Sequence, residues 1–194
     1  MDTKSGNKAR VPPGQRDVER KFPVLHAGEV PVIDLERWRF RIFGRVKNEV
    51  IWTWDEFMSL PKVTVCADMH CVTTWTRLDN VWEGVAFKEM MKHTEILPDA
   101  KFIMAHAYPN FTTNLPIEAV LDDDVLFAYR HDGKPLESDH GGPLRLVVPK
   151  RYAWKSAKWV RGIEFMPADR PGFWEQMGYH MSGDPWKEER MWGD

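Results

Sequence analysis

Stretches typical of strands and of helices follow one another along this chain in an irregular order, which limits the folds it can adopt. Trp38, Phe40 and Ile42 alternate with arginines, and this period of two predicts a strand with one buried face. The capping box Thr53–Glu56 predicts a short helix that ends before Pro61. Because strands and helices do not alternate regularly, the sequence predicts an α+β fold and not a parallel βαβ sheet.

The remaining elements fit the same class. Five more stretches have strand character, one has helical character and Pro116 is placed to begin a helical turn. We expect strands at 62–69, 101–105, 125–129, 144–148 and 160–166, a helix at 87–96, a turn at 131–134 between two of the strands, and a docked tail with one helical turn at 167–194. Residues 1–30 are expected to form an arm docked on a single domain of residues 31–194, since Pro12 and Pro13 exclude regular helix there.

Charge and composition exclude several classes of protein. The chain has 27 basic and 29 acidic residues and a net charge of -2, which gives no global field for nucleic acid or an anionic membrane. No apolar run is long enough, about 18 residues, to span a bilayer. The first residues are polar and do not resemble a secretory leader, so we expect a cytoplasmic protein. Two cysteines are too few for a disulfide framework.

Cys71 is the first candidate for chemistry, because it lies where a predicted strand ends and a polar turn begins. Such a cysteine can be a nucleophile, a ligand for a soft metal or an inert core residue. Cys66 and His70 could add ligands for zinc, but a structural zinc site needs four. His70 and Cys71 are also neighbours on a strand, where successive side chains face opposite ways.

The segment 140–162 is the second candidate, because it contains six basic residues and no acidic one. The preceding segment, 118–139, has the reverse bias, with seven acidic residues. Gly141 and Gly142 would allow a ligand to approach the backbone closely. Cations beside a permissive backbone suit phosphate or another oxyanion, although a solvated basic face remains the alternative. The cations are Arg145, Lys150, Arg151, Lys155, Lys158 and Arg161.

Aromatic residues between these cations leave a nucleic-acid function open, because bases stack on aromatic rings. Tyr152, Trp154 and Trp159 would supply that stacking. The absence of a net positive charge weighs against it, so we expect no nucleic-acid partner. The chain has ten tryptophans, which could line a large ligand pocket or simply build the core.

Several segments resemble the sulfite-oxidase-type family of molybdopterin enzymes, in the family's order and spacing, over about residues 32–166. The tail, from Gly172-Phe173-Trp174 to Pro185-Trp186, further resembles the small prokaryotic branch that includes a sulfoxide-reducing catalytic subunit. The segments that carry the resemblance are His70-Cys71-Val72-Thr73-Thr74-Trp75, Trp82-Glu83-Gly84-Val85, Leu115-Pro116-Ile117-Glu118-Ala119-Val120, Leu126–Tyr129, Gly133–Leu136, Asp139–Pro149 and Lys158-Trp159-Val160.

The resemblance implies a mixed α+β molybdopterin-binding domain in which the thiolate of Cys71 binds molybdenum. Cys71, His70 and His106 would form the catalytic set, although His70 replaces an arginine seen in some relatives. The basic segment would then hold the phosphate and ring of the pterin, with the arm as a cover. The cofactor contacts implied by position are Gln15, Arg16, Cys71, His106, Ala107, His140, Arg145, Ser156, Ala157 and Lys158.

The same resemblance implies oxygen-atom transfer at a small sulfur compound, either sulfite oxidation or sulfoxide reduction. The chain has no room for a haem domain or for the dimerisation domain of true sulfite oxidases. We therefore expect a separate electron-transfer partner and a monomer. Candidate cations for the substrate are His70, His106, Arg145 and Lys155. The alternative from the same residues is a non-catalytic protein that binds the molybdenum cofactor or an oxyanion.

Overall fold

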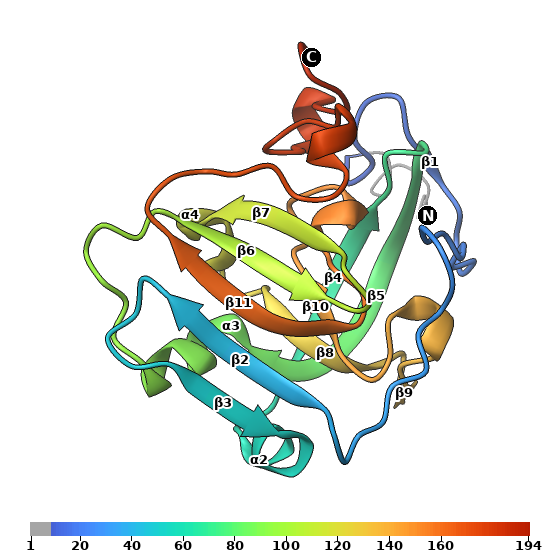
Figure 1. Cartoon of the computed structure of the whole chain (residues 1–194). Helices are drawn as coiled ribbons and strands as arrows, with labels where there is room; N and C mark the ends of the chain where they lie inside the picture. The colour runs from blue at the N-terminus through green and yellow to red at the C-terminus, as the bar shows by residue number, and fades with distance from the viewer. Residues whose placement is uncertain (1–8) are drawn as a thin grey trace.

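The computed structural model describes residues 9–194; the first eight residues of the predicted arm lie outside the described part. Two sheets pack against each other, with few and short helices around them (Figure 1). One sheet has the order β3-β2-β11-β6-β7, in which only β11 and β2 run parallel. Its strands are β2 (Arg39–Gly44), β3 (Val50–Thr53), β6 (Phe102–Ala107), β7 (Thr112–Pro116) and β11 (Val160–Met166).

The second sheet is organised around one long strand, β5, which pairs with β1, β4 and β8. β8 in turn pairs with β9 and β10, and only β1 runs parallel to its neighbour. This sheet carries most of the candidate site. Its strands are β1 (Arg16–Asp17), β4 (Val63–His70), β5 (Trp75–Ala86), β8 (Leu126–His131), β9 (Lys134–Pro135) and β10 (Arg145–Val147).

The α-helices of residues 9–194 are α2 (Trp54–Ser59), α3 (Phe87–Met90) and α4 (Ile117–Val120). The capping box is confirmed: the Thr53 hydroxyl accepts from the Glu56 amide at 3.3 Å, and the Glu56 carboxylate accepts from the Thr53 amide at 2.8 Å. Five single 3-10 turns are the other helical elements of the described residues. They are η1 (Met91–His93), η2 (Ser138–His140), η3 (Ala153–Lys155), η4 (Glu175–Met177) and η5 (Pro185–Lys187).

The predicted helix at 87–96 is wrong in its second half. α3 ends at Met90 and one 3-10 turn follows, after which the chain is extended. The extended part pairs with the segment after β2, because the amide of Lys47 donates to the Glu95 carbonyl at 2.8 Å and that of Leu97 donates to the Arg45 carbonyl at 3.0 Å. These long-range backbone bonds replace the helical ones, and local sequence contains no sign of them.

The prediction also missed β5 and simplified the turn that follows β8. β5 is buried along most of both faces, so its apolar and polar residues show no period of two. The turn at 131–134 leads into β9, which folds back on β8, and β10 pairs with the other part of β8.

The larger apolar cluster fills the space between the sheets. Phe40 of β2 and Phe127 of β8 meet edge to face with ring centroids 5.1 Å apart, which joins the two layers directly. A second cluster lies on the other side of the β5 sheet and contains Cys71, Trp75 and Trp82, with Phe22 of the arm packed against it. The α+β class expected from the sequence is confirmed, and the site lies beside the second cluster.

The arm and the tail both dock on the domain. The described part of the arm forms β1 against β5, and Arg10 makes an ion pair with Asp68. The tail is tied down through Glu175, whose carboxylate lies 2.6 Å from the Lys155 ammonium with both side chains fully buried. Between residues 9 and 194, no helix is long and apolar enough to cross a membrane.

Removing the charge of Glu175 is expected to destabilise the fold. Glu175→Gln would leave the Lys155 ammonium buried without a counter-ion, and breaking a buried pair in this way costs about 3–5 kcal/mol. Urea unfolding measures this loss. Glu95→Gln, which breaks the exposed pair with Lys47, is the matched control and should leave the midpoint unchanged. Equal effects of the two substitutions would contradict the structural role of the buried pair.

Candidate active site

Cys71 lies in the tight turn that joins β4 to β5, with its side chain buried. Its amide donates to the Trp75 carbonyl at 2.8 Å, and its carbonyl accepts from the Thr74 amide at 3.0 Å. Thr74 has a φ of 70°, in the left-handed region, which allows the turn to close. The Thr73 hydroxyl donates to the sulfur at 3.1 Å. The backbone therefore fixes the direction of the thiol.

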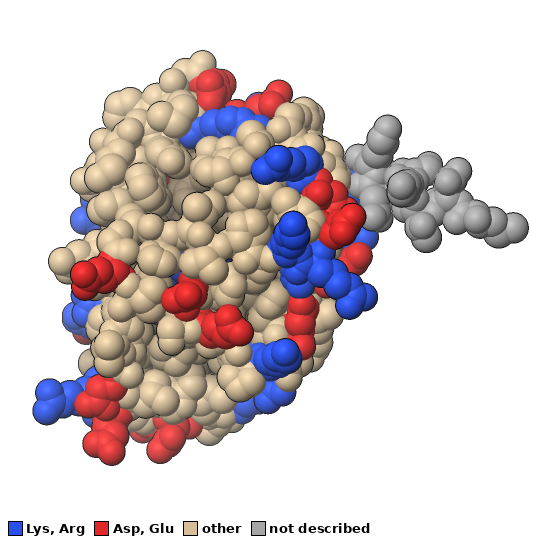
Figure 2. Space-filling model, turned by 90° about the vertical axis from the view of Figure 1, so that its right-hand side faces the viewer, with Lys and Arg blue, Asp and Glu red and all other residues tan. Residues whose placement is uncertain are grey.

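The thiol faces a cavity of about 390 Å³ bounded by the arm, the β4–β5 turn, the segment 153–159 and the tail. Figure 2 views the molecule from the side of the arm and shows a hollow bordered mainly by uncharged residues. Five of the residues implied by the family resemblance line this cavity. They are Cys71, Arg145, Ser156, Ala157 and Lys158.

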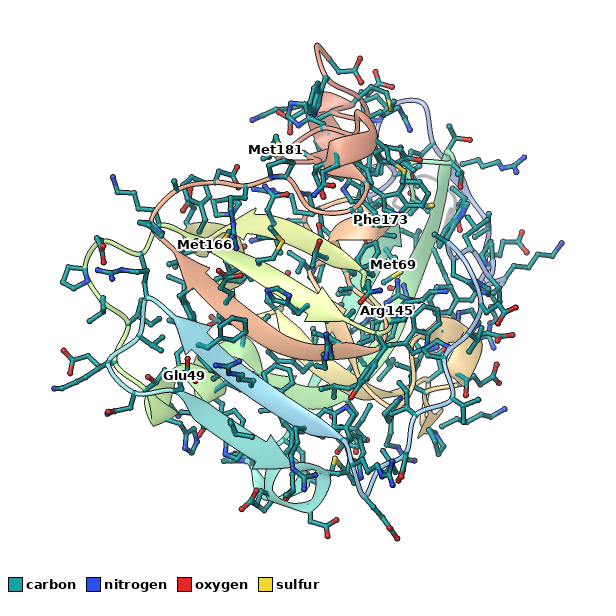
Figure 3. The ribbon with its side chains drawn as sticks, viewed as in Figure 1. Glu49, Met69, Arg145, Met166, Phe173 and Met181 are labelled. Atoms are coloured by element: carbon teal, nitrogen blue, oxygen red, sulfur yellow. The ribbon has the colours of Figure 1, made fainter. Side chains whose placement is uncertain are left out.

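Arg145 is the most unusual charge in the site, because it is 3% exposed and makes no ion pair with any carboxylate in the described chain. Its guanidinium donates to the His140 carbonyl at 3.0 Å and to the Met69 sulfur at 3.7 Å, and its Nε has no partner. Figure 3 shows Arg145 beside Met69, below Phe173 of the tail. Burial lowers the pKa of Arg145 to about 10, against a smaller opposing effect of Cys71. A buried guanidinium with an unused donor fits an anionic ligand.

Lys158 supplies the second cation of the cavity. Its ammonium donates to the carbonyl of Leu25 in the arm at 2.8 Å and to that of Asp139. Burial, together with the charge of Arg145, lowers the pKa of Lys158 to about 7. Gly141 lies against it with a φ of 109°, and a Cβ there would come within 3.0 Å of the Lys158 backbone. Gly141 therefore allows a close approach of Lys158, and its expected approach to a ligand stays a prediction.

The six cations of the basic segment do not act together. Only Arg145 and Lys158 line the cavity. Lys155 is neutralised by Glu175, so it does not serve as a free cation for substrate. Lys150 pairs with Asp122 on the surface at 2.9 Å. Charge segregation in the sequence therefore indicated a segment that lines the cavity, but only two of its six cations do so.

Six predicted site residues lie outside the cavity lining. Gln15 donates to the Cys71 carbonyl at 3.1 Å, and the backbone amide of Arg16 donates to the Thr74 carbonyl at 3.0 Å, so both residues support the β4–β5 turn from the arm. The side chain of Arg16 is exposed. His70 is buried against Thr76, with 2.9 Å between Nδ1 and the hydroxyl oxygen, and burial lowers its pKa to about 4. As expected for neighbours on a strand, its side chain lines a different recess from that of Cys71.

His106 and Ala107 are at the end of β6 in the other sheet. His106 Nε2 lies 3.0 Å from the Glu164 carboxylate, and Ala107 is part of the core between the sheets. Neither lines the cavity, so their predicted contact with the cofactor stays a prediction. His140 is also outside the lining, and its ring stacks on Phe22 with centroids 4.1 Å apart.

The sequence reasoning missed the residues that close the cavity. Phe22 of the arm and several aromatic residues of the tail line it, although the abundance of tryptophan and the docked tail were signals. Among the described residues, no group of three His, Cys, Asp or Glu side chains could hold a metal ion, so the zinc alternative finds no support. Cys66 and Cys71 are both free.

A mixed α+β domain with a buried thiol and two uncompensated cations around one cavity is suited to a cofactor that carries both a metal and an anionic group. The family described as "Oxidoreductase molybdopterin binding domain" matches residues 27–174, and the chain belongs to this family. It is an oxidoreductase, and its cofactor is the molybdenum–molybdopterin cofactor.

Similar proteins extend this result. The chain is 44% identical to the "Uncharacterized oxidoreductase YuiH" of Bacillus subtilis, over 98% of this chain and 96% of that protein. It is 27% identical to the mitochondrial sulfite oxidase of Drosophila melanogaster, over 81% of this chain but 32% of that protein. The sulfane dehydrogenase SoxCD from Paracoccus pantotrophus shares the fold, with a TM-score of 0.68 at 23% identity, over 74% of this chain and 41% of that one.

The arm is expected to retain the cofactor, because Phe22 fills the space between His140 and the cavity. Phe22→Ala would remove that ring contact and a part of the cavity lining. We expect purified Phe22→Ala protein to lose molybdenum about tenfold faster during dialysis, as measured by metal analysis over time. Val24→Ala, an exposed arm residue outside the cavity, is the control. Identical loss rates in the two variants would remove the arm from cofactor retention.

Proposed function

We propose that this chain catalyses oxygen-atom transfer at the sulfur of a small substrate, with Cys71 as the protein ligand to molybdenum. The observation that carries the proposal is the placement of the Cys71 thiol in one cavity with Arg145, whose buried guanidinium has an unused donor. A thiolate is a soft ligand suited to such a metal, and the guanidinium suits a phosphate or another anionic part of the cofactor. Lys158, Ser156 and Ala157 are the further proposed contacts.

The bound molybdenum cofactor would supply the two-electron redox chemistry and exchange of an oxygen atom. The protein's own residues would hold and orient it. The Thr73 hydroxyl donates to the Cys71 sulfur and would help to hold it in position for the metal. Arg145 and Lys158 would balance the negative charge of the cofactor, which relieves the cost of burying both cations.

The reaction balances in either direction. Reduction of a sulfoxide consumes two electrons and two protons and gives a thioether and water. Oxidation of sulfite takes an oxygen atom from water and gives sulfate, two protons and two electrons. Both directions of the reaction need a separate electron carrier. Sulfoxide reduction agrees with the name of one relative, 26% identical to this chain, the "Putative protein-methionine-sulfoxide reductase subunit YedZ1". A monomeric state and a cytoplasmic location stay predictions.

The test is metal analysis combined with two assays on cofactor-loaded protein. One follows sulfoxide reduction with a reduced viologen dye, and the other follows sulfite oxidation with ferricyanide. Turnover in either assay, with molybdenum bound in a one-to-one ratio, is the expected result. Protein that holds molybdenum but turns over neither substrate would favour the non-catalytic alternative, and protein that cannot hold the cofactor would overturn the proposal.

A further inference from the structure

Five aromatic side chains form a continuous surface inside the cavity, which we call the aromatic wall. The ring centroids of successive members are 5.0–5.7 Å apart, so each ring contacts the next. Three of the five come from the tail, whereas the other two come from the body of the domain. In order of contact, the aromatic wall consists of Phe111, Phe173, Trp174, Tyr179 and Trp154, and all five line the cavity.

The aromatic wall is held by buried polar groups. The Glu175 carboxylate accepts from the Trp154 indole and from the Thr113 hydroxyl, both at 2.9 Å, and it pairs with Lys155. Gly172 permits this approach, because a Cβ there would come within 2.6 Å of both the Glu175 carboxylate and the Thr112 carbonyl. Glu175 lies between Trp174 and Tyr179 in the chain, so its buried contacts anchor the part of the tail that carries these two residues of the aromatic wall.

Charge is distributed unequally around the cavity. Apart from His26, the ionisable cations that line it are Arg145 and Lys158. Arg145 donates to the His140 carbonyl and to the sulfur of Met69, two residues before Cys71, which places it at the thiol end of the cavity. Lys158 donates to the carbonyls of Leu25 and Asp139, neither of which belongs to the aromatic wall. In the described chain, the aromatic wall contributes no cation, and Lys155 behind it is already neutralised.

We propose that the aromatic wall binds the substrate and selects an uncharged organic sulfur compound, such as an aryl or alkyl sulfoxide, against an inorganic oxyanion such as sulfite. This rests on the proposed function, in which the cofactor occupies the thiol end and uses both cations. A sulfite dianion would then enter an apolar chamber without an unpaired cation, and burial of an unpaired charge is costly. An apolar group gains by contact with the rings. Trp174 and Tyr179 are the specificity-determining residues.

The test compares Trp174→Ala with wild type in the cofactor-loaded protein. Trp174→Ala should lower kcat/KM for methyl phenyl sulfoxide at least about tenfold, mainly through KM, with a much smaller change for dimethyl sulfoxide. Met177→Ala is the matched control, because Met177 lies in the 3-10 turn that begins directly after Trp174, is 56% exposed and does not line the cavity. Calorimetric titration of methyl phenyl sulfoxide into the oxidised, loaded protein measures binding without turnover and should show the same loss of affinity.

The outcomes separate this inference from the proposed function. Equal binding of methyl phenyl sulfoxide by wild type and Trp174→Ala, or a wild-type kcat/KM for sulfite at or above that for sulfoxides, would overturn the role of the aromatic wall even if Cys71 holds the metal. Failure of wild-type protein to retain molybdenum would instead overturn the proposed function. Glu175→Gln adds a check on the anchor: in protein that remains folded, it should raise KM for the aryl sulfoxide and leave the molybdenum content unchanged.

Discussion

Cys71→Ser is expected to lose bound molybdenum and at least about 100-fold of the oxygen-transfer activity. A hydroxyl of similar size preserves the turn between β4 and β5, but it is a hard, protonated donor in place of a soft thiolate. Substitution of residues that only support metal ligands already costs about 10–100-fold, so loss of the ligand itself should cost no less. Metal analysis and the sulfoxide and sulfite assays measure the two effects, and an unchanged thermal midpoint of the cofactor-free protein would show that folding is intact.

Cys66→Ser is the matched control for this substitution. Cys66 lies on β4, the strand that leads into the turn of Cys71, but is exposed and outside the cavity. It should keep both its molybdenum and its activity. Full metal content and activity in Cys71→Ser would exclude Cys71 as the ligand, and equal losses in both variants would point to a general effect of thiol removal.

Arg145→Met is expected to have opposite effects on the empty and the loaded protein. Because the lowered pKa of Arg145 means that the folded state disfavours the charged form, the penalty is fully present at pH 7 and would be relieved only as pH rises from about 10 towards 12.5. Replacement of buried charged groups by apolar ones stabilises proteins by about 1–4 kcal/mol. Cofactor-free Arg145→Met should therefore unfold at a higher temperature than wild type, while cofactor binding should fall at least about tenfold.

Calorimetric unfolding and metal analysis measure the two effects separately. Arg41→Met is the control, since Arg41 is an exposed residue of β2 paired with Glu49, and it should change neither quantity measurably. A cofactor-free Arg145→Met protein that is less stable than wild type would mean that Arg145 supports the fold. The buried charge of Arg145 would then give no support to an anionic ligand.

Local sequence patterns determined the elements whose hydrogen bonds are themselves local. The capping box at Thr53 and Glu56 depends on contacts three residues apart, and the alternation of Trp38, Phe40 and Ile42 follows from one buried face. Both predictions are confirmed for that reason. β5 escaped prediction because it is covered on both faces, and the helix after Phe87 was overestimated because Glu95 and Leu97 bond to a segment some fifty residues away.

The sequence by itself determined the family and the cofactor, since the segments around Cys71 and from Asp139 to Lys158 keep their spacing. Only the tertiary structure decided which basic residues are free. Lys155 and Lys158 are three positions apart in one basic run, yet the first is paired with Glu175 and the second faces the cavity. A charge pattern along the chain cannot reveal this difference, because the partner of Lys155 comes from the tail. The same docking of the tail places the aromatic wall in the cavity that the thiol also lines.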